Sequence, residues 1–317
     1  MQDGRSPVLA VVGPTASGKS DLAIELAKAY RGEVVSADSM QVYRGMDIGT
    51  AKVPLAKRAV PHHGIDLVDP GEPYSAALYQ SYARDVFEDV AARGKAAVLC
   101  GGTGFYVRAA LDDYDFAEGE QVGNAVRDLY QAMLAEKGPT AVWEALRDVD
   151  PESASKVHPN DSKRVIRALE MHEAGDSYAR RLDALKSVRQ HVPAILVGIQ
   201  VDRDVLNDRI ERRVDVMREE GLVDEVQGLL RRGFREGVTA KHAIGYKEVA
   251  AALDGRTSMD EAFDEIKTAT RRYAKRQRTW FGGDSRIKWV DGNSGNVESM
   301  LEQACEIVEA DGRWRQQ

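Results

Sequence analysis

The segment Gly13-Pro14-Thr15-Ala16-Ser17-Gly18-Lys19-Ser20 fits the phosphate-binding loop pattern G-x-x-x-x-G-K-S/T. It directly follows the apolar run Val8–Val12 and precedes a segment with apolar residues on one helical side, which is the context that the pattern requires. Glycines let the backbone turn tightly, so that successive amide groups point into one concave nest at the start of a helix. We therefore expect this loop to bind a diphosphate, with Lys19 adding a full positive charge and Ser20 able to ligate Mg²⁺.

The composition is that of an ordinary folded protein. The chain has 317 residues, of which 43% are hydrophobic and 30% charged, a length that suits a core domain with an insertion or a second small domain. No apolar run approaches the roughly 18 residues of a membrane span, and Met1–Pro7 lacks the apolar stretch of a signal peptide. The two cysteines, Cys100 and Cys305, form no C-x-x-C motif, so we expect neither a disulfide framework nor a zinc site. These features favour a cytoplasmic protein without a membrane segment.

Strand-like and helical patterns alternate along much of the chain, which predicts an α/β fold with a parallel sheet flanked by helices, as in phosphate-loop NTPases. The predicted strands are Val8–Val12, Glu33–Ser36, Ala96–Cys100, Ala194–Val201 and Ile287–Val290. A ligand would bind at the carboxyl ends of such strands.

The strand signals stop between about Ala117 and Val192. Helical patterns and loop breaks replace them, which predicts a helical insertion over 117–192 in a catalytic core made of 1–116 and 193–317. The predicted helices of the insertion are Val126–Glu136, Ala141–Leu146, Arg164–Glu173 and Tyr178–Val188, with breaks at Gly138-Pro139, Asp150-Pro151 and His158-Pro159.

A long basic helix is predicted near the carboxyl end. Its apolar seam includes Ile266, Tyr273 and Trp280 at seven-residue spacing. Its basic face is formed by Lys267, Arg271, Lys275 and Arg278, although the whole protein carries a net charge of −7. Such a face is either a solvated surface or a site that binds phosphates of a nucleic acid.

Asp38 follows the second predicted strand and opens the segment from Ser36 to Lys52. A carboxylate at the end of a strand, beside a phosphate loop, can be a general base or a partner of Mg²⁺. The alternative is that Asp38 merely closes the strand with an Asx-turn.

Asp38 belongs to an ordered series of motifs that resembles the tRNA dimethylallyltransferases, also called tRNA isopentenyltransferases. The resemblance runs from about Val8 to Asp291, and the segment Asp38–Lys52 is its most specific part. The later motifs are His62–Asp66, Gly101–Tyr106, His158–Asp161 with Arg164 and Arg167, Ile244–Glu248 and Ala274–Trp280.

The resemblance implies transfer of a dimethylallyl group from its diphosphate to the exocyclic 6-amino group of the adenosine just 3′ of the anticodon, in tRNAs that read codons beginning with U. It also implies Mg²⁺ as a cofactor and a helical insertion that grips the anticodon stem-loop. We expect a monomer.

The resemblance also assigns roles to single residues. Asp38 corresponds to the family's general base, Thr103 to a threonine near the reacting adenosine, and Arg213 to a cation that stabilises the departing diphosphate. The donor-binding set is Gly13, Pro14, Thr15, Ala16, Ser17, Gly18, Lys19 and Ser20. The tRNA-binding set is Asp38, Ser39, Met40, Gln41, Thr103, Arg127, Lys163, Arg164, Val165, Ile166 and Arg167, and the basic helix adds Arg271, Lys275 and Arg278.

Three other functions share the phosphate loop. A small-molecule kinase would need an adenine clamp and an acceptor pocket, for which the sequence offers no segment. An adenylate isopentenyltransferase, which modifies free nucleotide, would need neither the insertion nor the basic helix. A GTPase switch would carry an N-K-x-D motif, which the sequence lacks.

Overall fold

The computed structural model describes residues 7–114, 116, 124–184 and 189–314. The chain divides into two compact units, Met1–Leu111 with His191–Gln317 and Asp112–Gln190. The insertion predicted over 117–192 begins at residues outside the described ranges, as does the end of the helix predicted over Tyr178–Val188.

The first unit is built on a sheet whose neighbouring strands all pair in parallel. The strand order is β3-β2-β4-β1-β5-β6. The strands are β1 (Val8–Val12), β2 (Glu33–Ser36), β3 (His62–His63), β4 (Ala97–Gly101), β5 (Ala194–Gln200) and β6 (Ile287–Asp291). The predicted α/β class is confirmed, and β3 is an edge strand that the sequence patterns missed.

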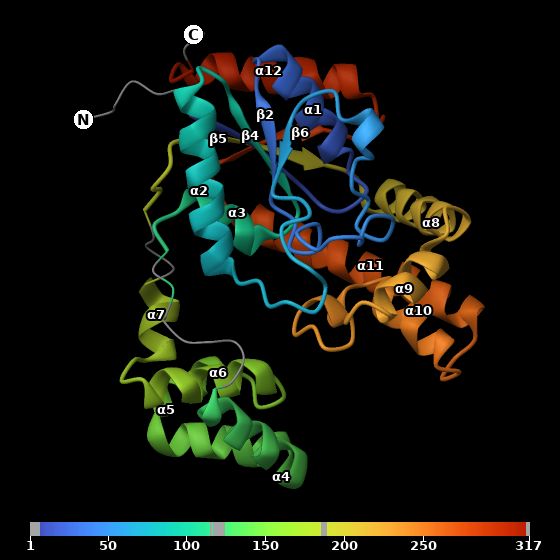
Figure 1. Ribbon diagram of the computed structural model, residues 1–317. Coiled ribbons are helices and arrows are strands. Elements are labelled where there is room, and N and C mark those ends of the chain that lie inside the picture. Colours follow the sequence, from blue (N-terminus) through green and yellow to red (C-terminus); the bar gives the residue numbers. More distant parts are fainter. Residues whose placement is uncertain (1–6, 115, 117–123, 185–188, 315–317) are drawn as a thin grey trace. The chain divides into compact units, whose positions relative to one another are not determined.

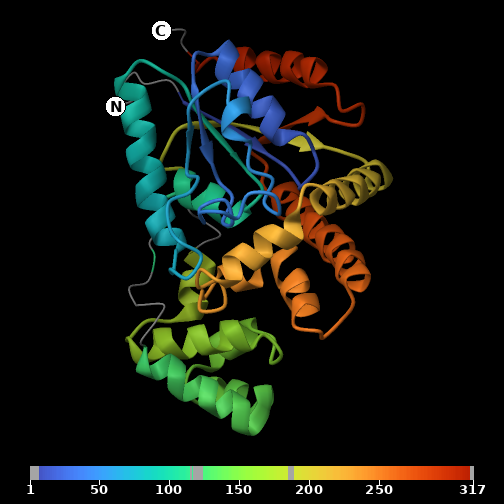
Figure 2. The same ribbon diagram turned by 45° about the vertical axis from the view of Figure 1, so that its right-hand side comes forward.

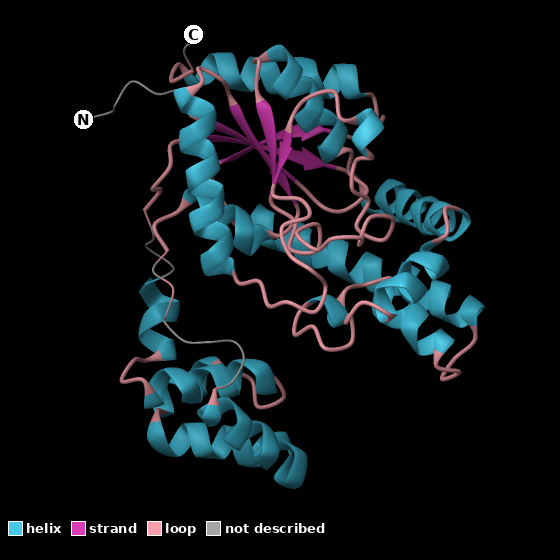
Figure 3. Cartoon of the chain, viewed as in Figure 1, coloured by secondary structure: helices cyan, strands magenta, loops and turns pink. Residues whose placement is uncertain are grey.

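Helices cover both faces of this sheet (Figures 1 and 2). On one face α1 and α12 pack against each other, and on the other α2 packs against α3 (Figure 3). The helices of this unit are α1 (Lys19–Ala29), α2 (Ala76–Ala92), α3 (Gly104–Leu111), α8 (Arg203–Glu219), α9 (Leu222–Leu230), α10 (Tyr246–Leu253), α11 (Met259–Gly282) and α12 (Val297–Asp311), with short 3-10 turns at Leu55–Lys57 and Ala240–His242.

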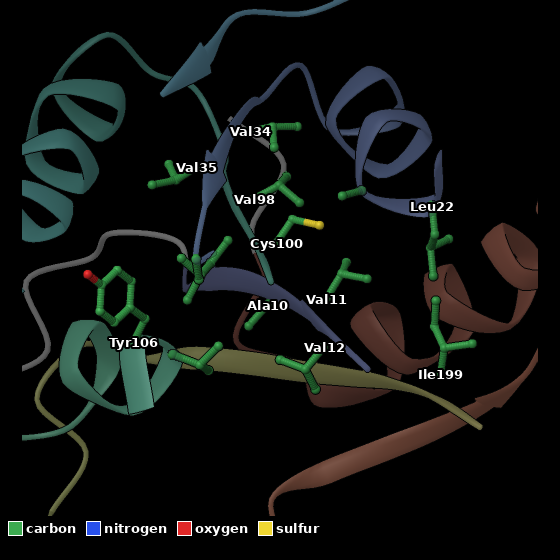
Figure 4. Packing of buried hydrophobic residues seen from close by; sticks show 14 of the residues in the cluster. Ala10, Val11, Val12, Leu22, Val34, Val35, Val98, Cys100, Tyr106 and Ile199 are labelled. Atoms are coloured by element: carbon green, nitrogen blue, oxygen red, sulfur yellow. The ribbon is translucent and has the colours of Figure 1, made fainter. Parts of the chain in front are cut away.

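The core lies between the sheet and these helices. Every residue of β1, β2 and β4 is buried, as expected for a parallel sheet covered on both faces. Figure 4 shows Val11 and Val34 on the side of Leu22 from α1, and Tyr106 from α3 on the other side. The continuous apolar runs of the sequence therefore reflect burial on both faces.

The sheet topology brings three loops together. Strand β4 lies between β1 and β2, and all three run in the same direction. The phosphate loop, Asp38 and the glycine turn at Gly101–Gly104 therefore leave the same edge of the sheet as neighbours.

The second unit is helical in its described residues. Its helices are α4 (Ala125–Val149), α5 (Pro151–Lys156), α6 (Ser162–Glu173) and α7 (Tyr178–Ala184). The break predicted at Gly138-Pro139 is a kink inside α4, where Gly138 has φ 81°. The break at Asp150-Pro151 is confirmed, because Asp150 caps α5 by accepting from the amide of Ser153. None of the helices in the described residues is both long enough and apolar enough to cross a membrane.

Candidate active site

The loop between β1 and α1 has the backbone of an anion-binding nest. Ala16 (φ 62°) and Gly18 (φ 91°) are in the left-handed region, and Gly18 is the N-cap of α1. Lys19 folds back over the loop, where its Nζ donates to the carbonyl of Pro14 at 3.2 Å. Amides of the loop and the start of α1 can therefore surround an anion.

The side chains of this loop differ in what they can reach. Thr15, Lys19 and Ser20 line a cavity of about 480 Å³. Ser17 is instead fully buried under the turn, where its Oγ lies close to Gly13. Ser17 can thus serve a ligand only through its backbone, whereas Lys19 and Ser20 can use their side chains.

Asp38 and Thr103 come together at the ends of β2 and β4. The Oδ1 atom of Asp38 accepts from the amide of Met40 at 2.9 Å, so Asp38 does form an Asx-turn. The amide of Ser39 donates to Thr103 Oγ1 at 3.1 Å, and the Thr103 hydroxyl donates to Ser39 Oγ at 3.3 Å. Asp38 and Ser39 also line the cavity that Lys19 lines. The Asx-turn and a catalytic role are therefore compatible.

Gln41 braces the loop that follows. Its Oε1 accepts from the hydroxyl of Ser36 at 2.8 Å, and its Nε2 donates to the carbonyl of Thr50 at 3.1 Å. Lys52 acts in the same way from a buried position, with its Nζ within 2.8 Å of Asp47 and 2.6 Å of Asp66. The specific segment Asp38–Lys52 is thus held by its own polar side chains, a structural role that the motif alone did not reveal.

Arg213 on α8 faces the same cavity as Lys19. Burial lowers the pKa of Lys19 from its ordinary 10.5, and the charge of Arg213 acts in the same direction. Burial also lowers the pKa of Arg213, which the carboxylate of Asp38 opposes. Two desolvated cations near each other favour an anionic ligand, because the anion would restore the electrostatic stabilisation that water no longer supplies.

The cavity is apolar along α8 and α11. Residues one helical turn apart on α8 line it beside Arg213, and the facing surface of α11 adds further apolar side chains. These residues are Ile210, Val214, Met217, Ile266 and Ala269. A ligand with a charged end and a small hydrocarbon end fits this arrangement.

Helix α11 contributes side chains that the sequence analysis did not assign to the site. Tyr273, Arg276 and Gln277 line the cavity. Burial raises the pKa of Tyr273 to about 12, and the charge of Asp38 acts in the same direction. Gln277 is buried and bonds to the phosphate loop, since its Oε1 accepts from the amide of Thr15 at 2.9 Å. The sequence offered one sign of this role, since Gln277 is a neutral residue within the otherwise basic motif Ala274–Trp280.

The predicted basic face of α11 is partly neutralised by α8. Lys267 Nζ lies 2.6 Å from an oxygen of Asp215, and Arg271 Nη1 lies 2.7 Å from an oxygen of Glu211. Lys275, by contrast, is exposed. Lys267 and Arg271 therefore hold α11 against α8, in addition to any contact with RNA.

Two predicted RNA-contacting residues of the second unit point inward. Val165 and Ile166 are buried in the core of this unit, where they pack with Leu169 and Val142. With both side chains buried, these two residues could contact tRNA only through their backbone, and their place in the tRNA-binding set stays a prediction. The helical repeat turns this face of α6 toward α4, and only the other faces remain for a ligand.

The predicted RNA-contacting cations of the second unit are more exposed than Val165 and Ile166. Arg127 and Arg167 meet at the buried carboxylate of Glu170, with nitrogen–oxygen distances of 3.0 and 3.1 Å. Lys163 and Arg164 are exposed at the start of α6. The predicted contacts of these four cations with RNA stay a prediction, and two of the cations already share the carboxylate of Glu170.

Comparison with known proteins points to one family. A model described as "IPP transferase" matches residues 41–284, and one described as "Isopentenyl transferase" matches residues 6–58. A tRNA dimethylallyltransferase of Kocuria rhizophila is 44% identical over 98% of this chain and 97% of its own length. One of Rhodococcus jostii is 49% identical over 92% of this chain and 94% of its own.

A solved structure agrees with these sequence relationships. A eukaryotic dimethylallyltransferase, described as acting on tRNA, matches with a TM-score of 0.77 at 27% identity, over 96% of this chain and 79% of that one. The family model covers most of the chain, and the bacterial relatives align over nearly its full length. The chain belongs to the IPP transferase family.

Proposed function

We propose that this protein transfers the dimethylallyl group of dimethylallyl diphosphate to the exocyclic 6-amino group of an adenosine in tRNA. The acceptor is the adenosine immediately 3′ of the anticodon, position 37, in tRNAs that read codons beginning with U. The observation that carries the proposal is the convergence of Lys19, Arg213, Asp38 and Ser39 on one cavity in a chain of this family.

Lys19 and Arg213 would hold the diphosphate of the donor, together with amides of the phosphate loop that follow Thr15, whose own amide donates to Gln277. As the bond between the allylic carbon and the diphosphate oxygen breaks, negative charge grows on the leaving group. Preorganised cations and amides stabilise that charge in a site shielded from water. The apolar residues along α8 would receive the hydrocarbon end.

Asp38 would act as general base. The lone pair of the adenine amine is delocalised into the ring, so the amine is a weak nucleophile, and a base that takes its proton as the new bond forms assists the reaction. The nitrogen forms a bond to the allylic carbon, the diphosphate leaves with the electrons of the carbon–oxygen bond, and Asp38 takes the proton. Thr103, which is hydrogen-bonded to Ser39, would lie beside the reacting base.

Mg²⁺ fits the donor side of the site as a partner of the diphosphate. Among the described residues, no three His, Cys, Asp or Glu side chains gather into a metal site. Ser20, however, faces the cavity next to Lys19 with a hard oxygen ligand, and Mg²⁺ in phosphate sites takes most of its ligands from phosphate and water. The ion would supply charge neutralisation to the leaving group.

The RNA would be bound by cations of both units. We assign phosphate contacts to Arg271, Lys275 and Arg278 on α11 and to Arg127, Lys163, Arg164 and Arg167 on α4 and α6. Ser39, Met40 and Gln41 would lie beside the target base. We also propose that the protein acts as a monomer and works in the cytoplasm, where its tRNA substrate would be found.

The test is to incubate the protein with dimethylallyl diphosphate, Mg²⁺ and tRNA, digest the RNA and identify the nucleosides by mass. We expect prenylated adenosine in the digest, lost when position 37 is guanosine. Adenosine monophosphate as the acceptor should give no product. Prenylation of the free nucleotide, without prenylation of tRNA, would instead make the protein an adenylate isopentenyltransferase.

A further inference from the structure

Gln277 is a buried amide in the middle of a basic helix. The residue is 5% exposed, whereas its neighbours Arg276 and Arg278 are exposed. A buried amide destabilises the folded protein unless its donor and its acceptor both find partners. The partners of Gln277 therefore indicate why this residue type stands here.

Both polar atoms of the Gln277 side chain form hydrogen bonds with backbone groups of the candidate site. Oε1 accepts from the amide of Thr15 in the phosphate loop at 2.9 Å. Nε2 donates to the carbonyl of Gly102 in the turn before Thr103 at 2.8 Å. The Thr15 amide can only donate and the Gly102 carbonyl can only accept, so the orientation of the Gln277 side-chain amide is fixed. A charged side chain cannot offer both the acceptor and the donor that these partners need.

The contact also explains the glycine at position 102. A Cβ atom there would lie 2.2 Å from Gln277 Nε2 and 3.2 Å from the carbonyl oxygen of Gly13. The turn after β4, the phosphate loop and α11 thus approach one another more closely than side chains at this point would allow.

We propose that Gln277 is a positioning residue, an inference that rests on the proposed function. Its side-chain amide sets the distance between the phosphate loop, which holds the donor, and the turn at Thr103, which receives the adenine. The amide joins the two halves of the reaction centre, and the reacting nitrogen and carbon depend on that spacing. A displacement of about 1 Å between reacting groups can slow a reaction by about 10²-fold.

Gln277→Met tests this role, because methionine keeps the length of the side chain and loses both hydrogen bonds. We expect the single-turnover rate at saturating dimethylallyl diphosphate and tRNA to fall by about 10²-fold. The dissociation constant for tRNA should stay within about twofold, since the phosphate contacts that dominate RNA affinity are untouched.

Gln303→Met is the matched control. Gln303 on α12 also accepts from a backbone amide, that of Asp291 at 2.9 Å, and donates to a backbone carbonyl, that of Ser299 at 3.1 Å. Its loss should lower the melting temperature without lowering the rate. Equal rates for the two variants would overturn the proposal. A normal rate at saturation with weakened tRNA binding for Gln277→Met would also overturn it, because Gln277 would then be a direct RNA contact.

Gln277→Glu gives a second readout that does not depend on the fate of Gln277→Met. A protonated carboxyl group carries one donor and one acceptor, whereas the ionised form would face the Gly102 carbonyl without a proton. Because burial raises a carboxyl pKa, the introduced carboxyl group should take up its proton as the pH is lowered from about 8 to about 6. The rate of the variant relative to wild type should rise over the same change in pH. A ratio that is flat and near one overturns the positioning role, and wild type without transfer activity would instead overturn the proposed function.

Discussion

At Asp38, one carboxylate has a structural partner and a proposed chemical role. Its Oδ1 closes a turn with the amide of Met40, and Asp38 lines the same cavity as Lys19 and Arg213. A turn needs only a hydrogen-bond acceptor, whereas a general base needs a group that can take a proton. The two roles can therefore be separated by one substitution.

Asp38→Asn should keep the turn, because the amide oxygen can still accept from Met40. It should also keep binding of tRNA and donor, while the single-turnover rate falls by roughly 10²- to 10⁴-fold through loss of the base. Asp291→Asn is the control, since Asp291 forms the same kind of turn with the amide of Asn293 at 2.9 Å, outside the site. A normal rate with a lowered melting temperature for Asp38→Asn would make Asp38 structural.

At the scale of elements, α11 is expected to bind RNA through the cations that α8 does not neutralise. Replacing Arg271, Lys275 and Arg278 together by Gln should flatten the log–log salt dependence of stem-loop binding, by up to about one unit per lost phosphate contact. Among the single changes, Arg271→Gln should have less effect than Lys275→Gln, because Arg271 is already paired with Glu211.

Lys28→Gln on α1 is the control for these measurements, because Lys28 is a surface cation paired with Glu25. The salt slope should not respond to it. Sequence preference around the target adenosine should survive the triple change, since phosphate contacts position RNA and base contacts specify it. An unchanged slope in the triple variant would make α11 a solvated surface and leave RNA binding to the second unit.

The start of β2 is held by a buried carboxylate, that of Glu33. Glu33 is 1% exposed and accepts from Arg93, from Lys95 at 2.7 Å and from His63 at 2.7 Å. These bonds, that of Arg93 above all, hold the pKa of Glu33 well below its ordinary 4.5. The carboxylate therefore stabilises the fold above that value, and this stabilisation is lost as the pH falls toward the folded pKa.

Glu33→Gln should lower the free energy of unfolding by about 2 kcal/mol at neutral pH, the scale of hydrogen bonds to a charged group. The difference from wild type should narrow as the pH falls below 4.5. Denaturant titrations at several pH values measure both. Glu25→Gln, at the exposed pair with Lys28, should change the free energy by less than about 0.5 kcal/mol. A pH-independent difference at Glu33 would mean that its charge contributes nothing.

For the molecule as a whole, sequence patterns predicted the features that depend on residues close together in the chain. The phosphate loop, the long helix α11 and five of the strands follow from periodicity, capping residues and glycines. Strand β3 was missed because its two residues, His62 and His63, show no period and become a strand only through pairing with Val34 and Val35.

The parts of the site that were missed depend on contacts between distant segments. Gln277 meets Thr15 across 262 positions, and Arg271 meets Glu211 across 60. Neither the sequence of α11 nor that of its partners reveals such a pair. Val165 and Ile166 are a different case, since the helical repeat of α6 already indicates that they face inward.

If the phosphate loop holds a prenyl diphosphate, transfer of the prenyl group to tRNA needs no nucleotide. Label from dimethylallyl diphosphate should enter tRNA at the full rate with Mg²⁺ and no nucleoside triphosphate. Lys19→Ala should lose most of this incorporation, because its ammonium group neutralises the leaving diphosphate. A strict requirement for ATP, or release of phosphate from ATP that depends on tRNA, would show that the loop serves a nucleoside triphosphate and would make the protein a kinase.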